Sequence, residues 1–210
     1  MTITISKIKG FISEHGFWRF TWKALTRSIS FVFSYKPLYL YSTSDLTRKD
    51  QQARCPLEIS IGNQVDIDLI VELLDYANET FVRKRSENAL NKGAKPFLVF
   101  SNDKMSHISW LFYPPIVREQ LIILKLKPTE AHIATCYTNP AFRGMNIYPT
   151  VLQHILRYAA EKGTKRVYIA SSPKNIASIR GIEKAGFSKI TTIKGFVLFG
   201  KLFNIYWESR

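Results

Sequence analysis

Hydrophobic and polar positions follow two spacings along this chain, and the changes between them predict its helices and strands. Short apolar runs bounded by turn residues indicate strands, whereas apolar positions three or four residues apart indicate helices. After residue 56 the two patterns are mixed and then alternate. The expected strands are 57–61, 96–100, 105–113, 120–126, 131–138, 166–170 and 188–193, with two short ones within 196–207, and the expected helices are 66–78, 83–91, 150–162 and 175–184.

The first fifty residues have a different character. Residues 7–33 place apolar side chains at roughly helical spacing, and residues 36–41 indicate a short strand. Residues 45–56 are polar and rich in turn formers, which marks the expected boundary. We therefore expect an N-terminal arm over 1–50 that packs on or extends a domain over 51–210. The arm combines aromatic and basic groups in Trp18, Arg19, Trp22, Lys23 and Arg27.

The order of elements predicts a mixed α/β fold. A hairpin over 96–113 favours an antiparallel first half, and the later strand–helix alternation favours crossovers. At 210 residues, with 46% hydrophobic side chains, the chain is long enough for one domain with a substantial core.

Positive charge is concentrated at the two ends of the chain. The whole sequence has a net charge of +14. Residues 1–50 contain 8 basic and 3 acidic groups, residues 51–140 contain 10 of each, and residues 141–210 contain 12 and 3. Such a distribution favours an anionic partner, such as a phosphorylated ligand or an acidic membrane surface, and it also fits a generally basic protein surface.

Cysteine content and hydropathy bear on location. Two cysteines, Cys55 and Cys136, cannot form a disulfide framework, which favours a reducing compartment. No apolar run approaches the roughly 18–20 residues of a membrane helix, and the first thirty residues lack the order of a secretory signal. We expect a cytoplasmic protein, and no metal, because no Cys/His cluster has zinc spacing.

One turn carries most of the candidate chemistry. Residues 137–149 join an expected strand to an amphipathic helix, and Pro149 suits the first helical position. Gly144 and Asn146 are residue types that tolerate a left-handed backbone. A tight turn leading into a helix directs free N–H groups to one point, as phosphate sites do, and Arg143 adds positive charge. Alone, the turn also fits an ordinary strand–helix connection.

A second segment changes the interpretation. Residues 175–187 follow an expected strand and read Asn-Ile-Ala-Ser, then Glu-Lys-Ala-Gly-Phe at the end. Together the two segments resemble the GNAT superfamily of acyl-CoA-dependent N-acetyltransferases. The turn is similar to that family's pyrophosphate loop, Arg/Gln-x-x-Gly-x-Gly/Ala, and the second segment to its Asn-x-x-(Ala/Ser)…Glu-Lys-x-Gly-Phe helix. The resemblance covers roughly residues 57–195.

This resemblance implies a mostly antiparallel mixed sheet that is splayed in the middle and has helices on both faces. It also implies acetyl-CoA, or another acyl-CoA, as co-substrate. The backbone of Tyr137 and Thr138 would pair with the pantetheine arm, and Asn175 and Ser178 would face the same channel. The amides that would hold the pyrophosphate belong to Arg143, Gly144, Met145, Asn146, Ile147 and Tyr148.

The chain departs from the family's motifs in ways that leave two outcomes open. Asn146 replaces a glycine but can adopt positive φ. Tyr148 replaces a small residue and Pro149 removes an amide, so the loop has either lost pyrophosphate binding or kept it with the Tyr148 side chain turned away. Ile182 stands where many members have a tyrosine that acts as general acid. Another group or water must then protonate the leaving thiolate, or the protein does not catalyse.

Acyl transfer needs a deprotonated amine, a stabilised oxyanion and a protonated thiolate. The candidates for proton transfer are His107, expected to share a strand face with Ser109, and Tyr137, near the expected thioester. Glu130 and His132, on the strand before the turn, come next. All four residue types also occur in purely structural roles.

Cys136 invites a covalent acyl intermediate, but a free cysteine on a central strand is usually an inert core residue. The sequence therefore predicts direct attack, in a ternary complex, by a primary amine of a small metabolite. An amino sugar or nucleotide-linked amino sugar is favoured, because residues 36–46, 107–110 and 143–149 look similar to GNAT proteins of bacterial surface-polysaccharide biosynthesis.

The alternative is a GNAT-like protein that is catalytically weak or inactive and binds CoA or an anionic partner through its basic ends. No nucleic-acid partner is expected, because no nucleic-acid-binding signature is present. The arm would suit peripheral contact with an anionic membrane surface. The C-terminal aromatic residues would suit a homodimer interface or simple sheet packing.

Overall fold

The computed structural model describes residues 33–119, 122–198, 201–203 and 205–208. The helix expected over 7–33 lies outside these ranges except for its last residue. Trp18, Arg19, Trp22, Lys23 and Arg27 lie outside them as well.

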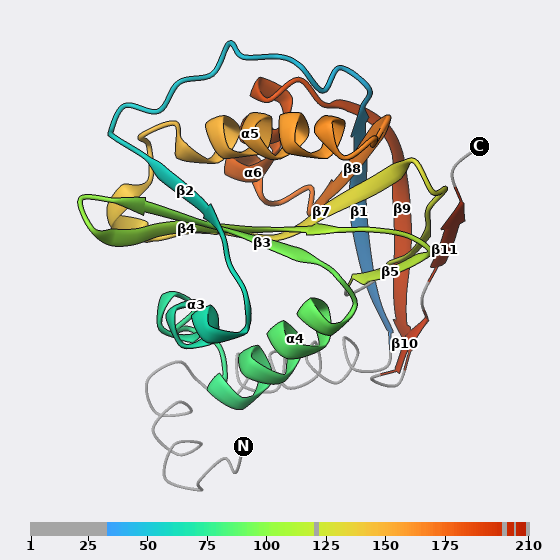
Figure 1. Cartoon of the computed structure of the whole chain (residues 1–210). Coiled ribbons are helices and arrows are strands. Elements are labelled where there is room, and N and C mark those ends of the chain that lie inside the picture. The colour runs from blue at the N-terminus through green and yellow to red at the C-terminus, as the bar shows by residue number, and fades with distance from the viewer. Residues whose placement is uncertain (1–32, 120–121, 199–200, 204, 209–210) are drawn as a thin grey trace, which may run out of the picture.

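The centre of the molecule is an eight-stranded sheet with the strand order β10-β9-β1-β8-β7-β4-β3-β2 (Figure 1). Neighbouring strands are antiparallel except for β7 and β8, which are parallel. The mixed, mostly antiparallel sheet expected from the sequence is thus confirmed. Its strands are β1 (Phe33–Thr43), β2 (Glu58–Ile61), β3 (Lys95–Ser101), β4 (Lys104–Phe112), β7 (Glu130–Thr138), β8 (Arg166–Ser171), β9 (Ser188–Leu198) and β10 (Lys201–Phe203).

A second sheet lies beside the first. It contains β5 (Ile116–Glu119), β6 (Ile122–Lys125) and β11 (Ile205–Glu208), in the order β11-β6-β5. Strand β5 was not expected, because four residues that include Arg118 and Glu119 give too short an apolar pattern. It forms through antiparallel pairing with β6, which begins three residues after β5 ends.

Helices cover both faces of the large sheet, as expected. In Figure 1, α3 (Ile67–Leu73) and α4 (Glu79–Asn91) lie on one face, and α5 (Ile147–Glu161) and α6 (Ile176–Lys184) lie on the other. The helix expected over 66–78 ends earlier because the Asn78 side chain accepts a hydrogen bond from the Phe81 amide and caps α4.

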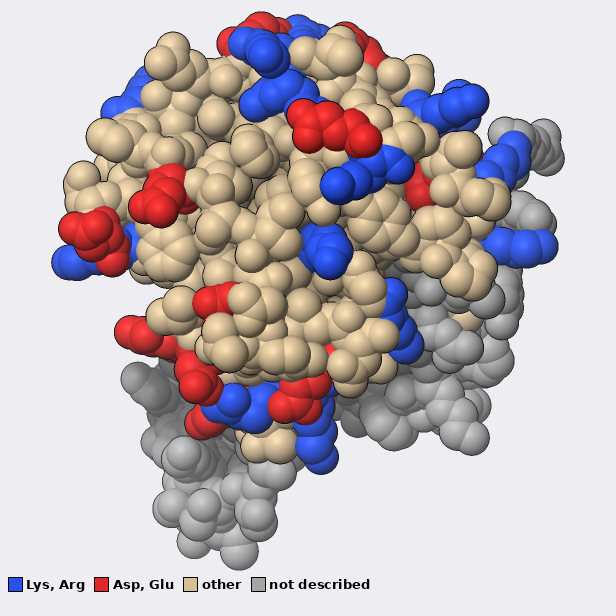
Figure 2. All heavy atoms as spheres, viewed as in Figure 1, with Lys and Arg blue, Asp and Glu red and all other residues tan. Residues whose placement is uncertain are grey.

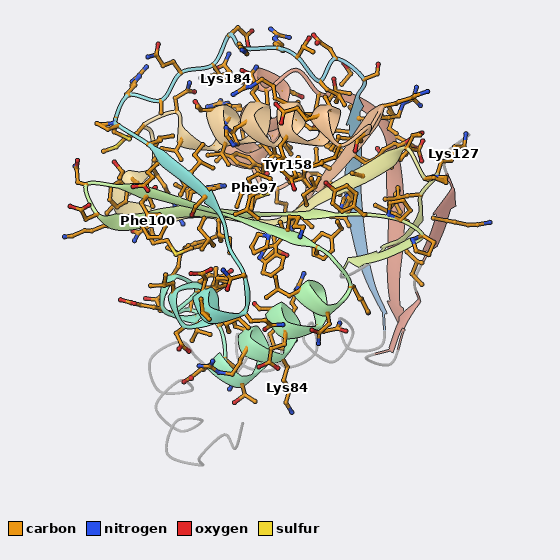
Figure 3. All side chains as sticks on the ribbon, viewed as in Figure 1. Lys84, Phe97, Phe100, Lys127, Tyr158 and Lys184 are labelled. Atoms are coloured by element: carbon orange, nitrogen blue, oxygen red, sulfur yellow. The ribbon has the colours of Figure 1, made fainter. Side chains whose placement is uncertain are left out.

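The larger core packs α5 against the sheet. The apolar face of α5 is fully buried at Val151, Leu152 and Ile155. Between the helix and β3, the rings of Phe97 and Tyr158 meet edge to face with centroids 5.3 Å apart (Figure 3). This packing fixes the start of α5 relative to the sheet.

Strand β1 comes from the N-terminal segment 1–50 that the sequence analysis treated as an arm. It lies inside the sheet, antiparallel to both β8 and β9. Its residues Leu40 and Tyr41 are at most 1% exposed. Residues 33–43, from the expected arm, are therefore part of the large sheet.

The parallel pair β7–β8 separates partway along its length. The two strands pair only from Glu130 to Ile133 on β7. Thr135 then adopts a φ of 51°, the register between β7 and β4 shifts by a bulge, and β7 continues to Thr138 paired with β4 but not with β8. A bulge of this kind redirects a strand, and the resulting gap is the splay that the family resemblance implied.

Two further observations concern the charged side chains on the surface and the hydropathy of the helices. On the face shown in Figure 2, Lys and Arg side chains are interspersed with Asp and Glu rather than gathered in one patch. Among the helices of the described ranges, none is long and apolar enough to cross a membrane.

Candidate functional site

The turn between β7 and α5 has the expected backbone conformation. Gly144 has a φ of 82° and Asn146 a φ of 59° and ψ of 20°, which are left-handed values. Before them, the Asn139 side chain accepts a hydrogen bond from the Ala141 amide and shapes a short 3-10 helix, η2 (Pro140–Phe142). The chain then enters α5 at Ile147, where the first amides of the helix have no partner within it.

A cavity of about 560 Å³ lies at this turn, between the end of β7 and the helices α5 and α6. It brings together nine of the ten residues expected to bind a cofactor; the exception, Met145, accepts a hydrogen bond through its carbonyl from the Arg54 amide. The cavity is lined by His107, Cys136, Tyr137, Thr138, Phe142, Arg143, Gly144, Asn146, Ile147, Tyr148, Pro149, Asn175, Ala177, Ser178, Arg180, Gly181 and Lys184.

The charge of the cavity wall is entirely positive. Arg143, Arg180 and Lys184 line it, and no acidic side chain does. Sequence reasoning did not place Gly181 or Lys184 in the site. Their spacing from Ala177, four and seven residues, puts all three on one helical face and is the signal that would have found them. A helix start, a left-handed turn and three cations form a site suited to a phosphorylated ligand.

The Tyr148 ring lies against α6. A Cβ added at Gly181 would clash with its Cδ1, so the ring occupies space that any other residue at 181 would fill. Its hydroxyl lies 3.5 Å from the Ser178 Oγ, and its ring centroid lies 5.7 Å from that of His107. Tyr148 is itself one of the residues that line the cavity.

His107 is a buried residue of the cavity wall and has a polar partner on each side. It is fully buried; its Nδ1 lies 2.7 Å from the Thr138 Oγ1 and its Nε2 lies 2.7 Å from the Ser109 Oγ. The shared strand face of His107 and Ser109 is as expected. Burial lowers the pKa of His107 to about 3, so the imidazole is neutral at pH 7.

Tyr137 and Arg143 form the edge of the site. The Tyr137 ring packs against Tyr76 of the α3–α4 face with centroids 5.0 Å apart. The Arg143 guanidinium lies 5.8 Å from the centre of the same ring, and its Nε donates to the Thr138 carbonyl at 3.2 Å. That carbonyl is one of the backbone groups expected to pair with pantetheine.

Glu130 and His132 do not reach the cavity. Both are buried at the opposite end of β7. Glu130 accepts hydrogen bonds from the Tyr168 hydroxyl at 3.0 Å and the Lys127 amide at 2.8 Å. The four candidates for proton transfer thus divide into two at the cavity, His107 and Tyr137, and two remote from it.

Asn175 and Cys136 have specific local partners. The Asn175 side chain caps α6 by accepting a hydrogen bond from the Ser178 amide at 3.1 Å. Cys136 is free of disulfides, lines the cavity and donates to the Ala134 carbonyl at 3.8 Å. Among the described residues, no three His, Cys, Asp or Glu side chains are grouped so as to hold a metal ion.

Comparison with solved structures shows a shared fold. A GNAT acetyltransferase from Colwellia psychrerythraea has 15% identity and a TM-score of 0.61, over 77% of this chain and 55% of that one. An aminoglycoside acetyltransferase solved with coenzyme A and kanamycin has 14% identity and a TM-score of 0.55, over 66% and 87%. A predicted acetyltransferase from Clostridium acetobutylicum, solved with acetyl-CoA, has 15% identity and a TM-score of 0.51, over 64% and 92%.

The present chain is shorter than several of the proteins that it resembles. It spans 55% of the Colwellia protein, and 63% and 64% of similar proteins from Novosphingobium aromaticivorans and Staphylococcus epidermidis. A search of curated protein sequences found no match. The model of the acetyltransferase (GNAT) family matches residues 72–187, which is more than half of the 210 residues. The chain therefore belongs to the GNAT family of acetyltransferases.

Proposed function

We propose that this protein transfers an acetyl or short acyl group from acyl-CoA to a primary amine of a small metabolite. The observation that carries the proposal is the basic cavity at the start of α5, which adjoins the gap between β7 and β8. Two of the structures that share its fold were solved with acetyl-CoA or coenzyme A bound. Family membership supports the same co-substrate.

In this proposal the turn holds the pyrophosphate of the co-substrate. The amides from Gly144 to Tyr148 supply N–H donors, whereas the Arg143 amide donates to the Pro140 carbonyl at 3.3 Å. The positive end of the α5 dipole adds to the attraction. Arg143, Arg180 and Lys184 neutralise the phosphate charges. The pantetheine arm then follows the unpaired part of β7, where Tyr137 and Thr138 have no β8 partner.

The polar groups at the cavity have different roles in proton transfer. A histidine with a pKa near 3 is a weak base, so His107 orients the Thr138 hydroxyl instead of deprotonating the amine. Tyr137 remains the second candidate for proton transfer at the cavity. The Tyr148 hydroxyl, on the cavity wall beside Ser178, or a water protonates the leaving thiolate. The amine attacks the thioester directly, and Cys136 takes no acyl group.

For the acceptor we propose an amino sugar, with a nucleotide-linked amino sugar favoured. Arg85 on α4 donates to the Thr135 Oγ1 at 3.0 Å, beside the bulge of β7. Among the described residues it forms no ion pair with a carboxylate, so a half-buried positive charge is available near Tyr76 and Tyr137. An acceptor that carries phosphate would satisfy this charge.

Calorimetric titration with acetyl-CoA at two salt concentrations tests the co-substrate. We expect saturable binding in the micromolar range, about −8 kcal/mol, that is weaker for dephospho-CoA. A thiol-release assay then compares amino sugars with their nucleotide-linked forms, and Arg85→Gln should raise the KM of the phosphorylated acceptors only. Absence of acetyl-CoA binding would overturn the proposal.

A second candidate is a protein that binds CoA without catalysis. It is favoured by Ile182, which is completely buried and carries no exchangeable proton where many members have tyrosine. Micromolar CoA binding with no thiol release from any amine tested would select this candidate.

The remaining assignments are proposals that rest on sequence. We propose a cytoplasmic location, in keeping with the two free cysteines, and a role in surface-polysaccharide biosynthesis. Contact of the N-terminal arm with an anionic membrane surface and assembly into a homodimer are proposed as well. Vesicle sedimentation and light scattering test these two.

A further inference from the structure

The segment that joins β1 to β2 crosses the outer side of α5. Residues 44–57, called the strap here, contain no helix or strand, and they pass over the helix in Figure 1. The strap is nevertheless held at defined points, and those points lie on the three elements that surround the cavity.

The strap first contacts the turn itself. The Asn146 side chain donates from Nδ2 to the Gln52 carbonyl at 2.8 Å and to the Gln51 Oε1 at 3.3 Å. One residue earlier, the Met145 carbonyl accepts from the Arg54 amide at 2.9 Å. Three hydrogen bonds therefore act on two consecutive residues of the turn, directly before α5 begins.

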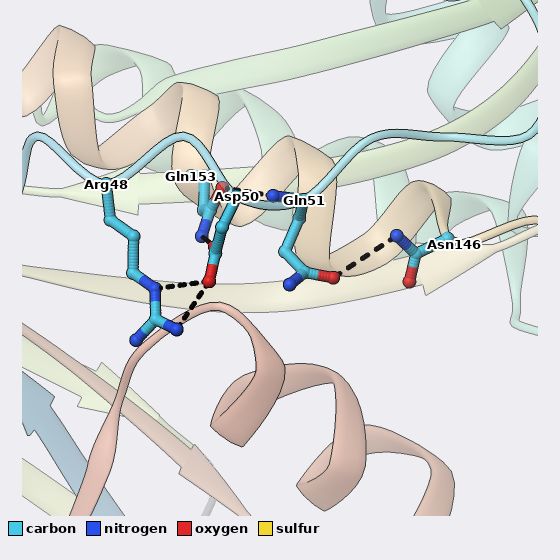
Figure 4. Close-up of polar contacts among 5 residues, drawn as sticks. All are labelled: Arg48, Asp50, Gln51, Asn146 and Gln153. Atoms are coloured by element: carbon cyan, nitrogen blue, oxygen red, sulfur yellow. Dashed lines mark hydrogen bonds and ion pairs between the residues drawn. The ribbon is translucent and has the colours of Figure 1, made fainter.

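The strap is also anchored on α5 through a buried side chain (Figure 4). Gln153 is 1% exposed; its Oε1 accepts from the Gln51 amide at 3.0 Å and its Nε2 donates to Asp50. Asp50 in turn pairs with Arg48, and the hydrogen bond from Arg48 lowers the pKa of Asp50 to about 2. The carboxylate is therefore ionised at neutral pH and keeps both partners.

A third contact reaches α6. Arg48 lies against the end of that helix, where a Cβ added at Gly186 would be 3.1 Å from the Arg48 Cδ. The strap thus touches the turn, α5 and α6, the elements between which the cavity opens.

We propose that Asn146 and Gln51 are positioning residues: their side chains hold the left-handed turn so that its amides face the anionic group of the ligand. A left-handed turn that includes Gly144 has little resistance to movement of its own. The hydrogen bonds from the strap supply that resistance, so strap residues that do not line the cavity affect the affinity for the ligand. This inference rests on the proposed function for the identity of the ligand, CoA.

The test distinguishes the effect of the Asn146 side chain from the effect of its left-handed backbone conformation. Asn146→Gly keeps the left-handed φ without strain and removes only the side-chain hydrogen bonds. We expect the Kd for CoA to rise about tenfold and amide hydrogen exchange at residues 144–148 to accelerate in the protein without ligand. Asn102→Gly, in the turn between β3 and β4 with a φ of 50°, is the matched control and should change neither quantity.

A second variant removes the hydrogen bonds between the strap and α5. Gln153→Met preserves the shape of a buried side chain that does not line the cavity, and it should produce the same two changes. Unchanged CoA affinity and unchanged exchange in Asn146→Gly would overturn the inference. If the native protein binds no CoA, the proposed function fails, and the exchange measurement still decides whether the strap holds the turn.

Discussion

The ring of Tyr148 occupies the space that a side chain at position 181 would otherwise take. Gly181 lies in the interior of α6, where glycine is the least favourable residue after proline. The large residue on α5 and the small one on α6 are thus complementary. This pairing accommodates the ring of a tyrosine at the start of α5.

Gly181→Ala should therefore destabilise the protein by about 1–3 kcal/mol through overpacking, although alanine is the better helix former. In a Tyr148→Ala background the same substitution should stabilise by up to about 1 kcal/mol, because only helix propensity then remains. Urea unfolding of the four proteins measures both effects. Equal effects of Gly181→Ala in the two backgrounds would show that the ring and position 181 are not coupled.

Tyr148→Phe removes the hydroxyl and keeps the ring. We expect stability and CoA affinity to stay close to native, while turnover falls by about 10²-fold if the hydroxyl protonates the thiolate. Single-turnover thiol release measures the chemical step. Native turnover in the phenylalanine variant would assign that proton to water.

Arg143→Ala should weaken CoA binding about tenfold, as expected for loss of a charged phosphate contact. Because the side chain is exposed, stability should change by less than about 0.5 kcal/mol. The salt dependence of binding should also become shallower. Lys165→Ala, an exposed substitution outside the cavity, provides the control and should leave affinity unchanged.

The lowered pKa of His107 predicts loss of stability in acid. The unfolded chain binds a proton at its ordinary value of 6.5, whereas the folded chain binds it only near pH 3. Between these values the unfolded state holds more protons, so stability falls with decreasing pH by at most about 1.4 kcal/mol per pH unit for this group. Urea midpoints from pH 7 to pH 4 should show a flatter dependence in His107→Asn. The slope should not vanish, because burial also lowers the pKa of His154.

Asn175 has a structural role that can be separated from a chemical one. Asn175→Ala should cost about 1 kcal/mol through loss of the α6 cap, whereas Asn175→Asp keeps an acceptor oxygen and most of the stability. If the carboxamide also contacts the pantetheine arm, both variants should lose acyl transfer. Full activity in the aspartate variant would limit the residue to capping.

Local features of this protein were predictable because local physics controls them. The left-handed conformations at Gly144 and Asn146 follow from residue type, and the common face of His107 and Ser109 follows from strand geometry. Nine of the expected ligand-binding residues reach one cavity because a strand, a turn and two helices in this order leave few arrangements.

Features that depend on distant parts of the chain were not predictable in the same way. Glu130 and His132 share β7 with the residues at the cavity, yet the length of the strand and the position of its bulge separate them from it. The residue that accommodates the Tyr148 ring, Gly181, follows it by 33 positions in sequence, and nothing in the local pattern pairs the two.

The sequence by itself determined most of the elements, the phosphate-type turn and the family, since each depends on residue types at short spacing. Only the tertiary structure decided that β1 lies between β8 and β9, that the strap holds Asn146, and that the Tyr148 ring turns toward α6. These arrangements arise from strand pairing, hydrogen bonds and packing between residues far apart in the chain. Such contacts form only when the whole domain buries its core.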